Sequence, residues 1–275
     1  MSKKTESDYI GKNYSGYIVN KYIAHGGFGM VFKGTTPKGL ECAIKIPIEQ
    51  KKYSAKSIVQ EAAIYEKINS DAVISATLVE NVLVMDLLKG SIQHFFQKVN
   101  KKFRMKTVIL IATKAIKCIQ SFHESGYIHR DIKPDNFGVT KENGFKLVDL
   151  GLAVPVGTKS KSFCGTARYS SISAHLKEPQ TYKDDLESLG YVLVYLYKGS
   201  LPWSRCKKED DYKEVLKLKQ TASNLTYGMP KEFRVYLDYV KSLDPEDTPH
   251  YNSCRRMFEK LFKKKGYTNE NFDLT

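Results

Sequence analysis

The chain has 275 residues, 41% of them hydrophobic and 27% charged, a balance that suits a globular fold with a sizeable core and excludes a fibrous repeat or a wholly disordered chain. Its 44 Lys and Arg residues against 30 Asp and Glu residues give a formal charge of +14, which favours polyanionic partners without choosing among nucleic acid, anionic lipid, ATP and acidic proteins. Five scattered cysteines without a C-x-x-C pair, and the lack of a long apolar run, argue against a zinc site, a disulfide framework and a membrane-spanning helix.

Strand patterns fill the first third of the chain. Two-residue alternation predicts strands at residues 17–23, 30–34 and 42–46, each bounded by glycine or proline, and we expect them to form an antiparallel meander. Helical spacing of apolar residues follows at 55–68, and an apolar strand is predicted at 81–88. One helix packed on a small sheet is therefore expected.

Helical patterns dominate the rest of the chain. They cover residues 106–125, 184–197, 233–243 and 253–265. We therefore predict an α+β fold in a single domain, residues 1–275, with a strand-rich lobe at 1–88 and a helix-rich lobe at 89–275. Residues 1–88 hold eleven Lys and nine acidic residues, a net charge of +2, so +14 minus +2 leaves +12 on residues 89–275.

A glycine-rich segment, IAHGGFGMV at residues 23–31, lies between two predicted strands and can close backbone amides over phosphates. It is weak evidence alone, because a glycine-containing hairpin turn fits it equally well. Lys45 follows within an otherwise apolar strand, where burial would require a counter-charge that Glu61 on the next helix can supply. A lysine that reaches solvent from an edge strand is the alternative.

The segment HRDIKPDN at residues 129–136 brings three reactive side chains close together in the sequence. Asp131 can accept a hydroxyl proton, Lys133 can neutralise a transferring phosphoryl group, and Asn136 can hold a metal. Asp149, at the end of an apolar strand, offers a hard oxygen ligand for a magnesium ion that bridges ATP phosphates. The joint spacing of these motifs is that of the protein kinase signature set.

On these motifs the chain resembles a eukaryotic protein kinase, and within that superfamily the casein kinase I family, over nearly its whole length. The stretches that carry the resemblance are HRDIKPDNF at 129–137, CGTARY at 164–169, DDLESLGY at 184–191 and GSLPW at 199–203. Most protein kinases have Ala-Pro-Glu where this chain has Ser171-Ile172-Ser173, which is similar to the Ser-Ile-Asn of casein kinase I. The resemblance implies a bilobal kinase fold and transfer of the γ-phosphoryl group of ATP to Ser or Thr hydroxyls with Mg²⁺, or alternatively Mn²⁺.

The resemblance also implies roles for individual residues. Asp131 would be the catalytic base, Lys133 and Asn136 would complete the catalytic loop, and Asn136 and Asp149 would hold the metal. Lys45 would contact the α- and β-phosphates and pair with Glu61, and Asp185 would support the catalytic loop. The residues that would enclose or contact the nucleotide are Ile23, Gly26, Gly27, Phe28, Gly29, Val31, Ala43, Met85, Asp86 and Leu88. Without the resemblance, core packing would be the favoured interpretation for the apolar members of this set.

Two departures from the family pattern concern the ligands. Gly138 stands where the family generally has a large apolar residue under the adenine, which would enlarge the pocket floor or shift Phe137 or Val139 to fill it. Family positions that bind a phosphate already present on the substrate are partly replaced, at Val154, Tyr182 and Asp211. Basic residues that remain as candidates are Arg130, Lys159, Lys161, Arg168 and Lys183. We therefore expect acidic protein substrates and weakened recognition of an upstream phosphoserine.

Two other functions are alternatives to an active kinase. The first is a pseudokinase scaffold that binds partners through the basic helical lobe, against which the complete set of kinase motifs argues. The second is nucleic-acid binding, which the charge alone suggests and no motif supports, so no nucleic acid is expected. The polar N-terminal segment lacks the apolar core of a signal peptide, so we expect the protein in the cytoplasm, the nucleus or both. We also expect a monomer without a membrane anchor.

Overall fold

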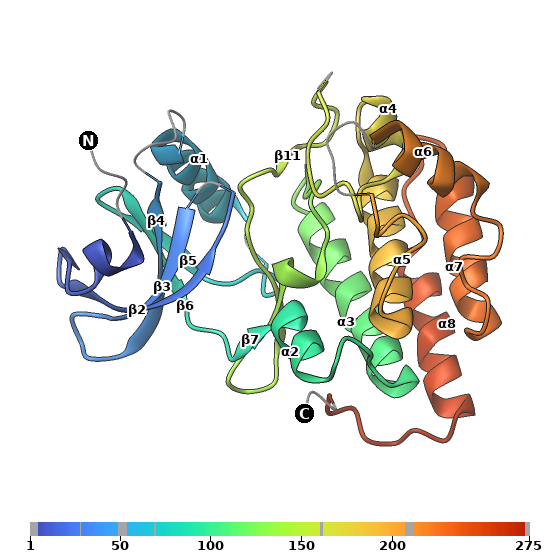
Figure 1. The fold of residues 1–275 in the computed structure, drawn as a ribbon, viewed down its shortest axis with the longest axis horizontal. Coiled ribbons are helices and arrows are strands. Elements are labelled where there is room, and N and C mark those ends of the chain that lie inside the picture. Colours follow the sequence, from blue (N-terminus) through green and yellow to red (C-terminus); the bar gives the residue numbers. More distant parts are fainter. Residues whose placement is uncertain are drawn as a thin grey trace.

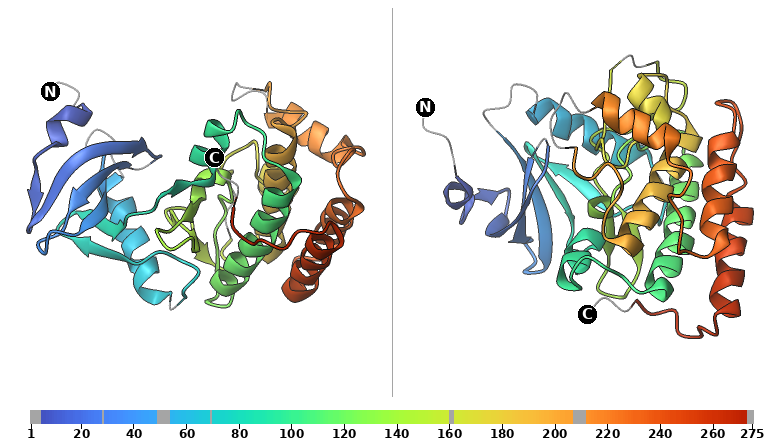
Figure 2. Two further views of the ribbon diagram at one scale, coloured as in Figure 1. Left: turned by 90° about the horizontal axis from the view of Figure 1, so that it is seen from below. Right: turned by 45° about the vertical axis from the view of Figure 1, so that its right-hand side comes forward.

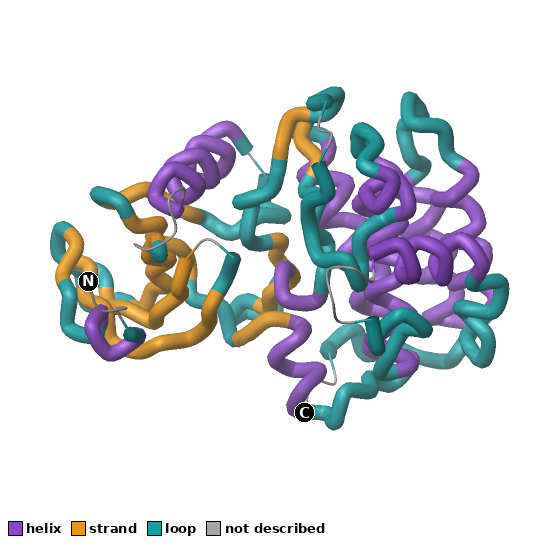
Figure 3. The backbone as a smooth tube through the Cα atoms, turned by 45° about the horizontal axis from the view of Figure 1, so that its top comes forward, coloured by secondary structure: helices purple, strands orange, loops and turns teal. Residues whose placement is uncertain are grey.

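The computed structural model describes residues 5–27, 29–48, 54–68, 70–159, 162–206 and 212–272. Two lobes lie side by side, one built from strands and a single long helix, the other mainly helical (Figure 1). Colouring by secondary structure shows the same division (Figure 3). The predicted α+β, bilobal architecture is therefore confirmed. No helix within the described ranges is long and apolar enough to cross a membrane.

A six-stranded sheet with the order β1-β2-β3-β4-β6-β5 forms the small lobe. Its strands are β1 (Asn13–Tyr14), β2 (Tyr17–His25), β3 (Gly29–Thr35), β4 (Glu41–Pro47), β5 (Ala76–Val79) and β6 (Val82–Asp86). The described strand pairs are antiparallel, so the predicted meander is confirmed. Strands β1 and β5 were not predicted, because each is too short to show an alternation, and neither was the 3₁₀ helix at Glu6–Tyr9.

Helix α1 (Ser54–Lys67) covers one face of this sheet, where it contacts β4, β5 and β6. Its buried residues Ile58, Ala62 and Tyr65 belong to the main core, which continues into the large lobe. The other face of the sheet has a separate cluster around Phe32 and Ile44. The α1 side chains thus tie the small lobe to the large one, which is how a residue of α1 can reach the active site.

Helices make up most of the large lobe. They are α2 (Ile92–Lys98), α3 (Met105–His123), α4 (Ile172–Leu176), α5 (Tyr182–Lys198), α6 (Tyr212–Thr221), α7 (Lys231–Ser242) and α8 (Tyr251–Lys264). Helices α3, α5, α7 and α8 agree with the four predicted helices to within a few residues. Helices α2, α4 and α6 were not predicted, since two of them are short and α6 has few apolar residues.

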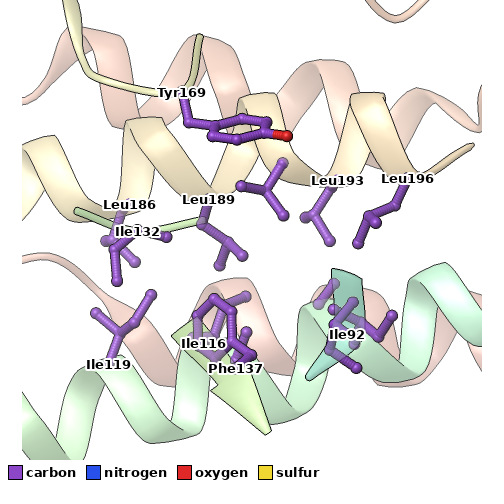
Figure 4. Packing of buried hydrophobic residues seen from close by; sticks show 14 of the residues in the cluster. Ile92, Ile116, Ile119, Ile132, Phe137, Tyr169, Leu186, Leu189, Leu193 and Leu196 are labelled. Atoms are coloured by element: carbon purple, nitrogen blue, oxygen red, sulfur yellow. The ribbon is translucent and has the colours of Figure 1, made fainter. Parts of the chain in front are cut away.

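Helix α5 runs through the centre of the large lobe, between α3 and α7. Leu186, Leu189 and Leu193 point from α5 toward α3 (Figure 4), and burial of each such side chain contributes about 1.5–3 kcal/mol. On the opposite side, a Cβ on Gly190 would lie 2.3 Å from Leu237 Cδ2, so only glycine permits this close packing against α7. The catalytic loop therefore rests on a rigid helix.

Two small sheets of short strands order the loops of the large lobe that lie next to the small lobe. They comprise β7 (Gly90–Ser91), β9 (Phe137–Val139) and β10 (Phe145–Leu147) in one sheet, and β8 (Tyr127–Ile128) with β11 (Val154–Pro155) in another. The 3₁₀ helix η2 (Pro134–Asn136) lies directly before β9. The segment after β6 crosses from the small lobe to the large lobe (Figure 2), and the Lys89 N–H anchors it by donating to Val139 O at 2.8 Å.

Candidate active site

Asp131 lies on the loop between β8 and η2, with 8% of its surface exposed. Lys133 Nζ contacts its Oδ2 at 2.6 Å, and Thr166 Oγ1 donates to its Oδ1 at 2.8 Å. Asn136 Nδ2 donates to the Asp131 backbone oxygen at 2.9 Å, which closes the loop on itself. Both carboxylate oxygens are thus held in fixed directions, as a group that accepts a hydroxyl proton requires. Thr166 belongs to the CGTARY stretch that carries the family resemblance, but the sequence did not predict its contact with Asp131.

Lys45 brings together residues from three parts of the chain. Its Nζ lies 2.6 Å from Glu61 Oε2 on α1 and 2.7 Å from Asp149 Oδ1, which follows β10. Lys45 is 4% exposed and Glu61 1%, so this is a buried ion pair and not a lysine that reaches solvent. The Asp149 N–H lies 3.2 Å from the Tyr65 hydroxyl oxygen, to which it donates. The predicted partners Lys45, Glu61 and Asp149 therefore meet at one point.

The Lys45 ammonium and the two carboxylates shift one another's pKa values. Burial alone would lower the pKa of Lys45, but the two carboxylates more than compensate and raise it above its ordinary value. Burial would likewise raise the pKa of Asp149, but the Lys45 ammonium lowers it to about 2. Burial raises the pKa of Glu61, against the effect of Lys45. Asp149 therefore stays ionised at neutral pH, as a metal ligand must.

Asp185, on α5, holds the backbone of the catalytic loop from below. Its Oδ2 accepts from the His129 N–H at 2.7 Å, and its Oδ1 accepts from the Arg130 N–H at 2.9 Å. His123 Nε2 lies 2.9 Å from Oδ2, and its Nδ1 lies 2.7 Å from the Tyr251 hydroxyl of α8. The structure thus places Asp185 in the supporting position that the resemblance implied, and adds a link through His123 to α8.

Two residues of this site adopt the left-handed backbone conformation. Arg130 has φ +65° and Asp149 has φ +62°, a region that side chains other than glycine seldom adopt. Gly165 has φ +93°, and a Cβ there would lie 2.4 Å from the Arg130 carbonyl oxygen. The activation segment therefore touches the catalytic loop at a point where only glycine fits, a constraint that the sequence pattern did not reveal.

Asp149 and Asn136 are the candidate metal ligands. Asn136 Nδ2 is used inside the catalytic loop, which leaves its Oδ1 as an oxygen donor, and the Asp149 side chain is 34% exposed although Lys45 contacts its Oδ1. Carboxylate and amide oxygens suit Mg²⁺. The described part of the chain holds no cluster of three or more His, Cys, Asp and Glu side chains that could bind a metal by itself. An ion here would therefore need further oxygens, which ATP phosphates and water can provide.

The predicted nucleotide residues lie on the small lobe and the segment after it. The turn between β2 and β3 is closed by the Gly26 N–H, which donates to Gly29 O at 2.8 Å, and Gly27 lies within this turn. Val31 pairs with Lys45 in the sheet, and Ala43 pairs with Met85. Ile23 is 48% exposed at the end of β2. Phe28 lies outside the described residues.

The segment after β6 leaves Leu88 with open backbone groups. The Asp86 N–H donates to Ser75 O at 3.2 Å and the Lys89 N–H to Val139 O at 2.8 Å. Between them, no hydrogen bond within the described part of the chain uses the N–H or carbonyl of Leu88. These two groups are therefore available to a planar heterocycle such as adenine.

The space beside Gly138 is filled in a way that the sequence did not suggest. The Leu88 side chain takes this place, which neither predicted outcome included, while Phe137 and Val139 are buried in the core. A Cβ on Gly138 would lie 2.2 Å from Leu88 Cδ1. The missing side chain on β9 is thus replaced by one from the segment between the lobes.

Three of the five basic residues considered for phosphate binding have partners inside the molecule. Arg130 Nε donates to Leu152 O at 2.8 Å, and Lys183 Nζ donates to Leu243 O at 2.7 Å. The Arg168 guanidinium lies over the rings of Tyr169 and Tyr195. Lys159 is exposed, and Lys161 and Asp211 lie outside the described residues.

Comparisons with known proteins agree with this geometry. The family model for the protein kinase domain matches residues 17–267. The chain is 34% identical over 281 residues to "Casein kinase I homolog 2" of Schizosaccharomyces pombe (strain 972 / ATCC 24843), an alignment that covers 92% of this chain and 64% of the relative. The chain thus spans less than two thirds of the length of this relative. It belongs to the protein kinase family, and its similarity to this relative supports its placement with casein kinase I.

Proposed function

We propose that this chain is an active serine/threonine kinase that transfers the γ-phosphoryl group of ATP to acidic proteins. The observation that carries the proposal is the convergence of Lys45, Glu61 and Asp149 beside a catalytic loop in which Asp131 is held by two donors. A scaffold without catalysis would not need this buried, mutually compensated charge set, which is costly unless it is complete. Nothing in the described residues favours the pseudokinase alternative.

Each of these residues has a defined task in phosphoryl transfer. Asp131 orients the substrate hydroxyl and accepts its proton, while Lys133, 2.6 Å away, offsets the negative charge that gathers on the transferring group. Lys45 holds the phosphates of ATP, and Glu61 keeps its ammonium in place. A magnesium ion, when bound, neutralises phosphate charge and would be held by Asp149 and Asn136.

Acidic substrates are favoured by charge. The large lobe carries a formal +12, and residues 152–168 contain no acidic side chain. Arg130, Arg168 and Lys183 are engaged inside the molecule, which argues against a preformed pocket for a phosphoserine. We therefore propose a diffuse attraction to acidic peptides in place of tight phosphate recognition.

Phosphate incorporation into casein tests the catalytic assignment. The wild type should phosphorylate casein with Mg²⁺ and ATP, and Asp149→Asn should not. Asp238→Asn is the matched control, because it makes the same chemical change on the exposed surface of α7 and should retain activity. Equal incorporation by wild type and Asp149→Asn would refute the assignment.

Three peptides that differ only at the third position before the acceptor test the substrate class. With Asp there, the initial rate should exceed that with Ala, and phosphoserine should improve on Asp by no more than about threefold, as expected for screened surface charges. The difference should shrink as salt is raised. A phosphoserine preference of about a hundredfold, the size expected of charge-assisted hydrogen bonds in a dedicated site, would contradict the proposal.

A further inference from the structure

Lys219 is a buried lysine that phosphoryl transfer does not explain. It lies on α6 with 1% of its surface exposed. Its Nζ donates to Ala167 O at 2.9 Å and to Ser170 O. Both carbonyls belong to the segment 166–171, which begins at Thr166, the residue that holds Asp131. Lys219 therefore supports the backbone that directly follows the catalytic contact.

The same segment has two further supports within the large lobe. Trp203 Nε1 donates to Arg168 O at 2.7 Å, so the carbonyls of residues 167, 168 and 170 all have side-chain donors. Glu187 of α5 accepts from the Ile172 N–H at 3.0 Å, just beyond the segment. The lysine thus donates to the carbonyls, and the glutamate accepts from the N–H. No carboxylate occurs within residues 166–173 themselves, where most protein kinases have the glutamate of Ala-Pro-Glu.

The surroundings of Lys219 are those of a fixed donor and not of a surface cation. Its Nζ lies 4.9 Å from the centre of the Tyr191 ring and 5.3 Å from that of Trp203. Burial lowers the pKa of Lys219 to about 7, against the opposing effect of Glu187, and Lys241 lowers it further. Much of its charge is therefore given up at neutral pH, while its N–H groups stay in place.

His175 gives independent support for a neutral amine. Its Nε2 lies 3.1 Å from both Ala167 O and Lys219 Nζ, and its buried Nδ1 has no partner. If Nε2 carries the hydrogen, it can donate to these two atoms, and the amine can donate its two hydrogens to the carbonyls. If Lys219 were an ammonium, His175 Nε2 would have to accept a hydrogen from it, and Nε2 would then face the Ala167 carbonyl oxygen, which is also an acceptor. The ring hydrogen would have to lie on Nδ1, which has no partner. The neutral arrangement satisfies every donor.

We propose that Lys219 is a positioning residue for the peptide substrate: it fixes the segment 166–171 beside Asp131, where the chain flanking the acceptor hydroxyl must pass. This inference rests on the proposed function, because it assumes that a peptide hydroxyl reaches Asp131. It assigns to Lys219 no contact with ATP, whose predicted residues lie in the small lobe and at Asn136 and Asp149.

Steady-state kinetics of Lys219→Met on an acidic peptide test this role. Methionine has a similar length and suits the aromatic surroundings but donates no hydrogen bond, and removing hydrogen bonds to positioned backbone should raise the peptide KM about tenfold or more. The KM for ATP and the slow hydrolysis of ATP without peptide should not change. Lys217→Met is the matched control, since it removes an exposed lysine from the same helix and should leave all constants unchanged.

A second variant keeps the test decisive if Lys219→Met folds poorly. His175→Phe removes both ring nitrogens but keeps an aromatic ring against Phe163 and Tyr212, and it should raise the peptide KM in the same direction. Peptide constants equal to those of the control would overturn this inference alone. A parallel loss of ATP hydrolysis would also overturn it, because the role would then be general. A wild type that phosphorylates no peptide would overturn the proposed function and this inference together.

Discussion

Leu88 lies against Gly138, so that the side chain of one residue occupies the space that a side chain on the other would need. The two residues are 50 positions apart in the sequence, and a Cβ on Gly138 would come within 2.2 Å of Leu88 Cδ1. Leu88 also carries the open N–H and carbonyl groups that are available to adenine. The size of residue 138 therefore limits where the side chain of Leu88 can lie, on the residue whose backbone would bind the nucleotide base.

A larger residue at position 138 should weaken ATP binding. Gly138→Leu must displace the Leu88 side chain, which belongs to the residue that offers its backbone to adenine, so we expect the KM for ATP to rise about tenfold, equivalent to about 1.4 kcal/mol. The double variant Gly138→Leu with Leu88→Ala removes the clash and should recover much of this loss. The KM for ATP, measured for the wild type, the two single variants and the double variant, completes a double-mutant cycle. Purely additive effects would show that the two side chains do not compete for space.

The buried charges around Lys45 should separate stability from activity. Lys45→Met leaves Glu61 buried without its partner, and we expect the free energy of unfolding to fall by about 3–5 kcal/mol. Adding Glu61→Gln removes the stranded charge and should restore much of the stability but none of the kinase activity. Urea unfolding and casein phosphorylation measure the two properties. Recovery of activity in the double variant would contradict the assignment of Lys45 to the phosphates.

Two adjacent aspartates on α5 should respond differently to the same change. Asp185→Asn replaces one of the two oxygens that accept from the backbone N–H groups of residues 129 and 130, so kcat should fall by at least about tenfold. Asp184 is the matched control, because burial raises its pKa to about 6 and it accepts from the Thr181 N–H and the Ser171 side chain, neither of which belongs to the catalytic loop. Asp184→Asn retains an oxygen for the bond from the Thr181 N–H and should keep nearly full kcat. An equal loss in both variants would refute the supporting role of Asp185.

Lys219 should make stability depend on pH in the neutral to alkaline range. Its pKa is about 7 in the folded protein and 10.5 ordinarily, so between these values the unfolded chain binds more protons than the folded one. The free energy of unfolding should therefore rise with pH across this window by a few kcal/mol, and the contribution of this residue should be level below pH 7. Lys219→Met should lack this rise. Urea unfolding from pH 6 to pH 9.5 compares the two proteins, and identical slopes would contradict the lowered pKa.

The chemistry of the site could be predicted because it depends on short motifs. The catalytic loop is one short motif that contains Asp131, Lys133 and Asn136 within six residues. The ion-pair cluster consists of Lys45 in a strand, Glu61 in a helix and Asp149 at the end of a strand, all at recognisable positions in the sequence. The longer helices were also predictable, since 14 or more residues give a clear apolar period. The local sequence was sufficient to predict those functional residues and helices whose pattern lies within a short stretch of chain.

Residues that act through distant backbone could not be predicted in this way. Thr166 meets Asp131 from 35 positions away, and Gly165 is required because the Arg130 carbonyl comes close to it. Lys219 follows Lys217 in a polar helix, and nothing in the sequence shows that one is buried and the other exposed. Each of these roles is set by tertiary contacts, which neither spacing nor composition encodes.

Backbone hydrogen bonds join the two lobes at two separated points, in addition to the side-chain contacts of Lys45 and α1. One is the segment after β6, where the Lys89 N–H donates to Val139 O. The other is the stretch before β5, where the Leu147 N–H donates to Ala72 O at 2.7 Å and the Ile74 N–H donates to Leu147 O at 3.3 Å. A rotation about the line through these two points would keep both sets of backbone hydrogen bonds, so it is the opening movement that disturbs the backbone least. Asp149 lies two residues from Leu147, at one of these points, whereas the glycine turn joins β2 and β3, on the other side of the sheet from β5 and β6.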